Sequence, residues 1–244
     1  MSRDLYPLVA FVLGLGIGIS AACLAVDEPP DAWTDAHEEA STAAVNEGGL
    51  RLLTADAASG THAHDNRIAI RPESLVDGWV GLDQCHRALD AVPAAQVVFQ
   101  PGRIRQIRVT RSDGIGRAWV AEHSVQIEDV GQDAVLCIRA ESLALHDLGQ
   151  GRFRLRTGPY MRRFLDGYYP MRLALHVEHP QTLRLMGQYP QVQPGLGITA
   201  TEDRLGLDAT FKGRLIVCLD FCATDQGACA PITLECDPRD GGVP

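Results

Sequence analysis

The chain has 244 residues, of which 45% are hydrophobic and 22% are charged. These are ordinary values for a globular protein, and they exclude a wholly disordered chain and a protein that crosses the membrane many times. The formal net charge is −9, and no basic run interleaved with aromatic residues occurs, so nucleic acid is not an expected partner.

The N-terminus has the order of an export signal. Arg3 precedes the uncharged run Leu8–Ile19, and the small residues Ser20-Ala21-Ala22 then lead to Cys23. We therefore expect residues 1–22 to be a signal segment.

Residues Ser20–Cys23 resemble the lipobox of bacterial lipoproteins, whose cysteine becomes the lipid-modified first residue of the mature chain. Ser20 departs from the Leu, Val or Ile that is usual at its position. The resemblance implies lipid attachment at Cys23 and a location in the bacterial cell envelope. It favours the outer membrane, because Leu24 is not the aspartate associated with inner-membrane retention.

Two alternatives to lipid attachment follow from the same segment. Cleavage after Ala22 or Ala25 would release a secreted protein without lipid. The apolar stretch Leu8–Val26 has 19 residues, which is just long enough to remain as an uncleaved membrane anchor.

From Asp27 to about Asn66 the sequence is acidic and rich in Ala, Thr, Ser and Gly, without an apolar pattern that a fold would bury. Such a segment cannot offset the entropy cost of ordering. We therefore predict lipid attachment and an acidic flexible tether over residues 23–66, followed by a folded domain over residues 67–244.

Beyond Arg67, short alternating runs broken by Gly, Pro and Asp indicate an all-β domain. The clearest runs are Trp119–Ile127, Phe153–Leu155, Met171–Val177 and Leu215–Leu219, and further strands are expected at 67–71, 95–99, 103–109, 134–140 and 181–186. No helix-length crossover separates them. We therefore predict an antiparallel β-sandwich, built as one domain or as two small β subdomains.

One segment breaks the alternation. Pro159 can occupy a first helical position, Tyr160 and Phe164 lie four residues apart, and Gly167 can end a helix. This spacing predicts one short helix near residues 159–167. Together with Tyr168 and Tyr169, the aromatic residues suit either a stacking platform for sugar or a small core.

The chain has seven cysteines, so lipid attachment at Cys23 leaves an even number for disulfides in an oxidising compartment. A hairpin of residues 215–221 with 232–236 would nest Cys222–Cys229 inside Cys218–Cys236. Cys85 and Cys137 then form the third pair. A zinc site is the alternative for the C-terminal four, which lack a C-x-x-C knuckle.

Four histidines and an aspartate supply an alternative function. The unit His62, His64 and Asp65 would place both imidazoles on one side of an extended chain, and His176 and His179 lie at a strand end. Imidazole and carboxylate suit Cu²⁺ or Zn²⁺, so the alternative is a periplasmic copper- or zinc-handling protein. Ordering a tether costs about 1–2 kcal/mol per residue, so we predict that the two segments do not converge on one ion.

Arg152, Arg154 and Arg156 are predicted to project from one face of a strand. Guanidinium groups match phosphate and carboxylate, which makes this face a candidate for binding an anion or a partner. The alternative is a solvated face whose charges are balanced by acids on the neighbouring strand.

Motifs of enzymes and cofactor sites are absent: the sequence has no G-x-S-x-G, H-E-x-x-H, P-loop or haem-attachment pattern. No catalytic residue or cofactor is predicted, and a carboxylate-based hydrolase is the third alternative, because its two acids can come from any part of the chain. The leading prediction is a non-catalytic envelope lipoprotein, whose β-sandwich binds an envelope protein or glycan or assembles into a complex.

Overall fold

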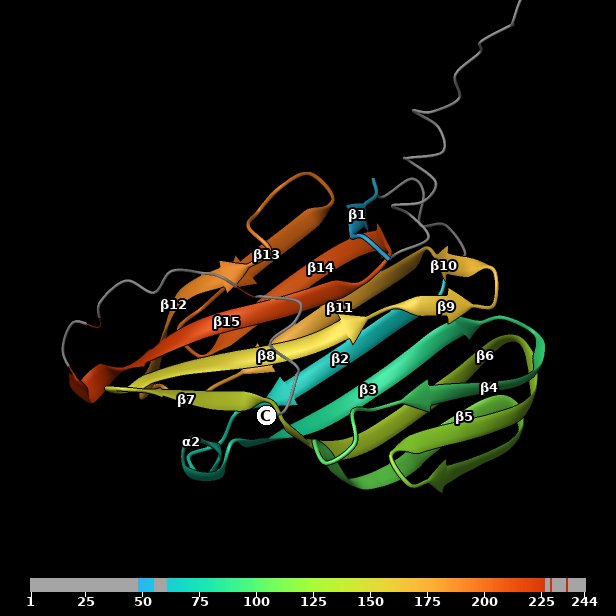
Figure 1. Ribbon diagram of the computed structural model, residues 1–244, viewed down its shortest axis with the longest axis horizontal. Helices are drawn as coiled ribbons and strands as arrows, with labels where there is room; N and C mark the ends of the chain where they lie inside the picture. The colour runs from blue at the N-terminus through green and yellow to red at the C-terminus, as the bar shows by residue number, and fades with distance from the viewer. Residues whose placement is uncertain (1–47, 55–60, 227–228, 230–235, 237–244) are drawn as a thin grey trace, which may run out of the picture. The chain divides into compact units, whose positions relative to one another are not determined.

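The computed structural model of the chain describes residues 48–54, 61–226, 229 and 236 (Figure 1). These residues are almost entirely strands, which confirms the all-β prediction. The elements are β1 Arg51–Leu52, β2 Ala63–Ala69, α2 Ser74–Asp77, β3 Trp79–Leu89, β4 Val92–Val98, β5 Ile104–Ala121, β6 Ser124–Leu143, β7 Leu145–Gly149, β8 Arg152–Tyr160, β9 Arg162–Phe164, β10 Gly167–Tyr169, β11 Met171–Glu178, β12 Leu183–Tyr189, β13 Leu196–Ala200, β14 Arg204–Lys212, β15 Leu215–Ala223 and the 3₁₀ turn η2 Thr224–Gln226.

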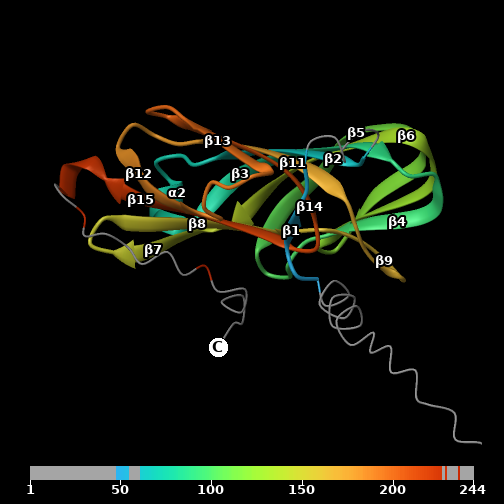
Figure 2. The same cartoon turned by 90° about the horizontal axis from the view of Figure 1, so that it is seen from above.

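Two sheets form the sandwich. The large sheet has the order β1-β14-β11-β2-β3-β6-β4, with β13 beside β14 and β5 beside β6, and the small sheet has the order β12-β15-β8-β7. Figure 2 shows β7, β8 and β15 as a layer against the large sheet. The pair β2 and β11 is parallel, so the large sheet is mixed rather than wholly antiparallel.

The main core lies between the two sheets, because alternate residues of the facing strands are apolar. Leu173 and Leu175 of β11 and Leu219 and Phe221 of β15 are completely buried. Burial of each such side chain stabilises the fold by about 1.5–3 kcal/mol relative to exposure. The residues of β15 that point away from this core are buried too, including Asp220.

Strands β4, β5 and β6 form a three-stranded ribbon that extends from the large sheet. β6 lies in its middle: β5 pairs with one edge of β6, and β4 and then β3 pair with the other edge. Val125 from the first half of β6 and Leu136 from its second half belong to one apolar cluster, so the ribbon bends between them. Asp129 and Asp133 have φ values of 52° and 60° in this stretch, and irregularities of this kind increase strand twist and bend a sheet.

The folded domain begins earlier than the tether prediction placed it. β1 pairs with β14 through Arg51 and Leu52, and β2 is an interior strand of the large sheet between β3 and β11. Residues 63–66 therefore belong to the fold rather than to a tether. These residues are as polar as those of a linker, although they form a strand, because the side chains that they contact inside the sandwich are polar as well.

The short helix predicted near residues 159–167 is wrong. β8 continues to Tyr160, and β9 and β10 form a hairpin in which Tyr168 pairs with Arg163. Tyr160 is buried in the sandwich, whereas Phe164 contacts Tyr169 across the hairpin with a ring-centroid distance of 5.2 Å. A helix would place both aromatic rings on one face. The helical residues that the structure describes lie instead in α2 and η2.

Three disulfides connect the domain, and their pairs are those that the cysteine spacing predicted. Cys85–Cys137 joins the neighbouring strands β3 and β6, and Cys218–Cys236 and Cys222–Cys229 attach the chain after β15 to that strand. Residues 232–235 of the expected hairpin lie outside the described residues. By restricting the unfolded chain, each bridge is expected to contribute about 2–4 kcal/mol.

No helix within the described ranges is long and apolar enough to span a membrane. The export segment, Cys23 and residues 23–47 lie outside those ranges.

Candidate functional site

His62 and His64 lie in the fold beside a third histidine, His86. His64 and His86 are opposite each other on β2 and β3, and their stacked rings have centroids 4.2 Å apart. His62 Nε2 lies 3.0 Å from His86 Nδ1, and Gln84 Nε2 lies 3.2 Å from His86 Nε2. The Gln84 amide donates, so neutral His86 carries its proton on Nδ1 and donates it to His62. We call His62, His64 and His86 the histidine cluster.

Burial keeps the histidine cluster neutral. Burial, followed by the nearby Arg162 charge, lowers the pKa of His62 to about 4. Burial and then the charge of His62 lower the pKa of His64 to about 3. Burial lowers the pKa of His86 well below its usual value, and the other two imidazoles lower it further. All three rings are therefore uncharged at neutral pH.

Polar side chains continue from the histidine cluster across the sandwich. Asn66 Nδ2 donates to the Tyr160 hydroxyl at 2.5 Å, and the Tyr160 and Thr157 hydroxyls lie 2.6 Å apart. Burial raises the pKa of Tyr160 to about 12, although both hydrogen bonds lower it. Within the described part of the chain, the buried atoms His64 Nε2 and Asn66 Oδ1 have no hydrogen-bond partner, which suits ordered water.

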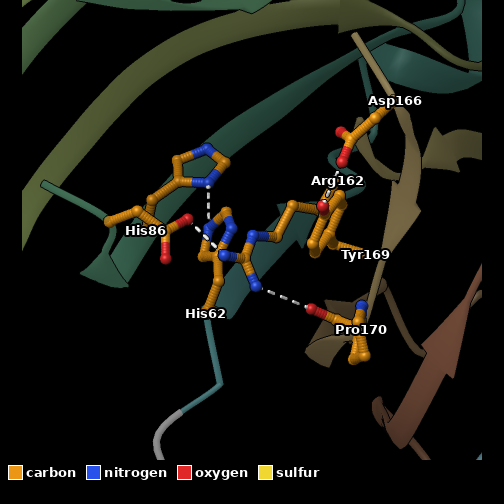
Figure 3. Close-up of polar contacts among 7 residues, drawn as sticks. His62, His86, Arg162, Asp166, Tyr169 and Pro170 are labelled. Carbon is orange, nitrogen blue, oxygen red and sulfur yellow. Dashed lines mark hydrogen bonds and ion pairs between the residues drawn. The ribbon is translucent and has the colours of Figure 1, made fainter. Parts of the chain in front are cut away.

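Arg162 attaches the β9–β10 hairpin to the fold beside the histidine cluster (Figure 3). Its Nη1 donates to the Pro170 carbonyl at 3.1 Å, and its Nη2 forms an ion pair with Asp90 between β3 and β4. Tyr169 donates its hydroxyl hydrogen to Asp166 at 2.6 Å across the same hairpin. The hairpin is thus held on both sides of its turn.

The five residues predicted for the metal alternative do not meet. Asp65 pairs with Arg87 at 2.7 Å on the other face of the sheet. His176 is exposed on β11, and His179 packs its ring against Phe221 with centroids 5.0 Å apart. The His62 carbonyl accepts a hydrogen bond from the Arg172 N–H at the start of β11, whereas His179 follows the end of that strand. At about 3.3 Å per residue, the two histidines lie about 20–25 Å apart.

The histidine cluster itself does not converge on one ion either. The stacked rings of His64 and His86 are inclined by only 27°, so their nitrogen lone pairs lie in nearly parallel planes. Over the residues that the structure describes, no three or more His, Cys, Asp or Glu side chains are arranged to hold a metal.

Arg152, Arg154 and Arg156 share the outer face of the small sheet, and we call these three residues, with Arg103 and His146, the arginine face. Arg154 donates to buried Asp220 on β15 at 2.7 and 2.9 Å, so this arginine is balanced by a neighbouring strand. Arg156 is different. Its Nε is buried and, among the described residues, has no hydrogen-bond partner.

Arg103 adds to this positive charge, and His146 lies beside it. Arg103 donates to the Leu143 carbonyl at 2.8 Å and lies 2.8 Å from His146 Nε2. Burial and then the Arg156 charge lower the pKa of Arg103. Burial, Arg103, Arg156 and Arg154 lower the pKa of His146. The Arg103 and Arg156 guanidinium groups repel each other, and an anion at this position would relieve their repulsion.

A cavity of about 530 Å³ adjoins the arginine face. Arg103 and His146 line it, together with Phe153, Ser74 and other residues of α2, β7 and the β4–β5 loop. A ligand that places an anionic group near Arg103 can therefore extend into a cavity with both apolar and polar walls.

Several residues of these sites were not predicted from the sequence. His86 and Gln84 alternate along β3 as polar residues, a pattern that usually marks a solvated face. Arg103 follows a Pro-Gly turn and gave no signal. Asp220 was detectable in principle, because an acid inside the apolar run Leu215–Phe221 requires a partner.

Comparisons with known proteins gave only distant structural likenesses. No family model and no curated protein matches the sequence. An M1 zinc metallopeptidase from Deinococcus radiodurans is 12% identical, with a TM-score of 0.40 over 73% of this chain and 43% of that chain. The same enzyme bound to a Tyr-Ser-Ala substrate gives a TM-score of 0.38 at 12% identity and the same coverage. A two-domain M1 zinc metallopeptidase bound to L-tryptophan gives 0.36 at 14% identity, over 73% of this chain and 44% of that chain. The chain spans less than half of these proteins, and likenesses this low are no basis for assigning an activity.

Proposed function

We propose that the chain is an exported, membrane-attached and non-catalytic module of the bacterial cell envelope. In this proposal a lipid at Cys23 holds the chain at the membrane, with the outer membrane favoured by Leu24. The β-sandwich is displayed to an envelope protein or glycan, which it binds through the arginine face.

The observation that carries the proposed binding role is Arg156. Its buried Nε lacks a hydrogen-bond partner among the described residues, and the Arg103 guanidinium adds further positive potential near it. A buried donor without a partner is costly, whereas a guanidinium that meets a phosphate or carboxylate forms strong, charge-assisted bonds. The geometry therefore suits an anionic group on the partner.

Inorganic pyrophosphate is a suitable probe of this face. Arg156→Gln is expected to weaken pyrophosphate binding to the full chain about ten- to a hundredfold, because a hydrogen bond to a charged group is worth about 1.5–3 kcal/mol. Arg156→Lys should restore only part of the affinity, because it lacks the guanidinium fork. Calorimetry measures both effects.

The matched control is Arg117→Gln, which removes the same charge from β5, where Arg117 is exposed and lies 3.9 Å from Glu128. It should change the affinity less than about twofold. Equal losses in Arg117→Gln and Arg156→Gln would show only general charge attraction and would overturn the proposal.

The membrane attachment is tested at Cys23. The mature protein is expected to begin at Cys23 and to partition into detergent, and Cys23→Ala should release it from the membrane fraction. Mass spectrometry of the N-terminus and detergent partitioning measure this. Recovery of full-length chain with residues 1–22 still attached would contradict lipid attachment and favour the uncleaved anchor.

A further inference from the structure

The β9–β10 hairpin carries a group of exposed apolar side chains at its tip. Leu165 is fully exposed, and the exposed fractions of Met161, Phe164 and Tyr169 are 43%, 37% and 36%. Arg163, which lies 5.6 Å from the Tyr168 ring, adds a positive charge beside them. We call residues 161–169 the hairpin tip.

The hairpin tip is held in place although its apolar side chains are exposed. Tyr168 is buried at its base, and Arg162 fixes it through the Pro170 carbonyl and Asp90. Phe164 and Tyr169 pack edge to face. Little ordering entropy is therefore left to lose when the tip meets a partner, which favours binding.

The chain enters the folded domain beside this hairpin. A Cβ atom built on Gly48 would lie 2.6 Å from Tyr168 Cζ, so the backbone of Gly48 runs directly against the tyrosine ring. The proposed lipid attachment is at Cys23, and residues 24–47 separate it from Gly48. A flexible chain of that length would have an end-to-end distance of about 27 Å and a full extension of about 80 Å.

We propose that the hairpin tip docks on the bilayer to which the N-terminus is attached, with its apolar side chains at the boundary between headgroups and acyl chains. Leu and Phe bury apolar area there, Tyr suits the interface, and the Arg163 guanidinium can reach lipid phosphate. This inference rests on the proposed membrane attachment. It adds a second, weaker contact that holds the domain against the membrane.

The test uses the full chain reconstituted in phosphatidylcholine and phosphatidylglycerol vesicles. Leu165→Trp should gain fluorescence that brominated acyl chains quench at least twofold more than the fluorescence gained in Val76→Trp. Val76 is a matched site because it is an 89% exposed apolar residue on α2. The native tryptophans are common to both variants, so the wild-type signal is subtracted.

Vesicle flotation separates the two proposals. If the chain does not float with vesicles at all, the membrane attachment fails. If the chain floats and Leu165→Trp is quenched no more than Val76→Trp, the docking inference is overturned while the attachment stands. Protection of the Trp at position 165 only after a protein partner is added would also overturn it, because the tip would then be a protein-binding surface.

Discussion

Acidification from pH 7.5 to pH 5 is expected to lower the free energy of unfolding by about 2 kcal/mol for each of His62 and His64, with a further loss from His86. The folded-state pKa values of His62 and His64 are lowered to about 4 and about 3, and that of His86 is also lowered. Above pH 6.5 these imidazoles are neutral in both the folded and the unfolded state, so they contribute nothing to the pH dependence of the free energy of unfolding. Below it the unfolded chain binds protons that the folded chain does not, so stability falls until the pH reaches the folded-state values.

Urea unfolding of the oxidised chain at several pH values measures this loss. His86→Gln should make the loss of stability between pH 6.5 and 5 less steep, although it also lowers stability at neutral pH. A slope in His86→Gln equal to that of the wild type would contradict the assignment to the histidine cluster.

Asp220→Asn is expected to lower the free energy of unfolding by about 3–5 kcal/mol. The Asp220 side chain is 1% exposed and that of Arg154 is 16% exposed. Removing the carboxylate charge breaks a charge-assisted pair of which both members are largely buried, and desolvation makes that loss costly. Chemical denaturation at pH 7.5 measures the loss.

Asp208→Asn is a close control, because Asp208 also pairs with an arginine across neighbouring strands. That pair, with Arg172, is about half exposed on both sides, so its loss should cost about 0–1 kcal/mol. Similar losses of unfolding free energy in the two variants would mean that Asp220 contributes no more than a surface ion pair. That result would contradict the stabilising role of the buried pair between Asp220 and Arg154.

Much of the fold follows from local patterns. Alternation over Met171–Val177 and Leu215–Leu219 predicted strands whose inward residues are buried in the structure. The run Trp119–Ile127 alternates just as well, yet it is two strands, because β5 ends at Ala121 and β6 begins at Ser124. A two-residue turn preserves the period of two, so alternation alone cannot locate it.

The candidate site could be predicted only in part. Spacing of two put Arg152, Arg154 and Arg156 on one face, since strand geometry fixes side-chain direction locally. Which of them has a partner depends on residues far away in the sequence: Asp220 lies opposite Arg154, whereas Cys218 lies opposite Arg156. In the same way, His64 meets His86 only because β2 and β3 pair in one particular register. Registers of this kind are tertiary facts that no local pattern contains.

The most direct test of the arginine face is a crystal structure of the full chain with bound pyrophosphate. We predict a phosphate oxygen about 2.7–2.9 Å from Arg156 Nε, the distance of a charge-assisted hydrogen bond, with Arg103 and His146 beside the anion. A pyrophosphate bound elsewhere while the arginine face stays empty would contradict the account.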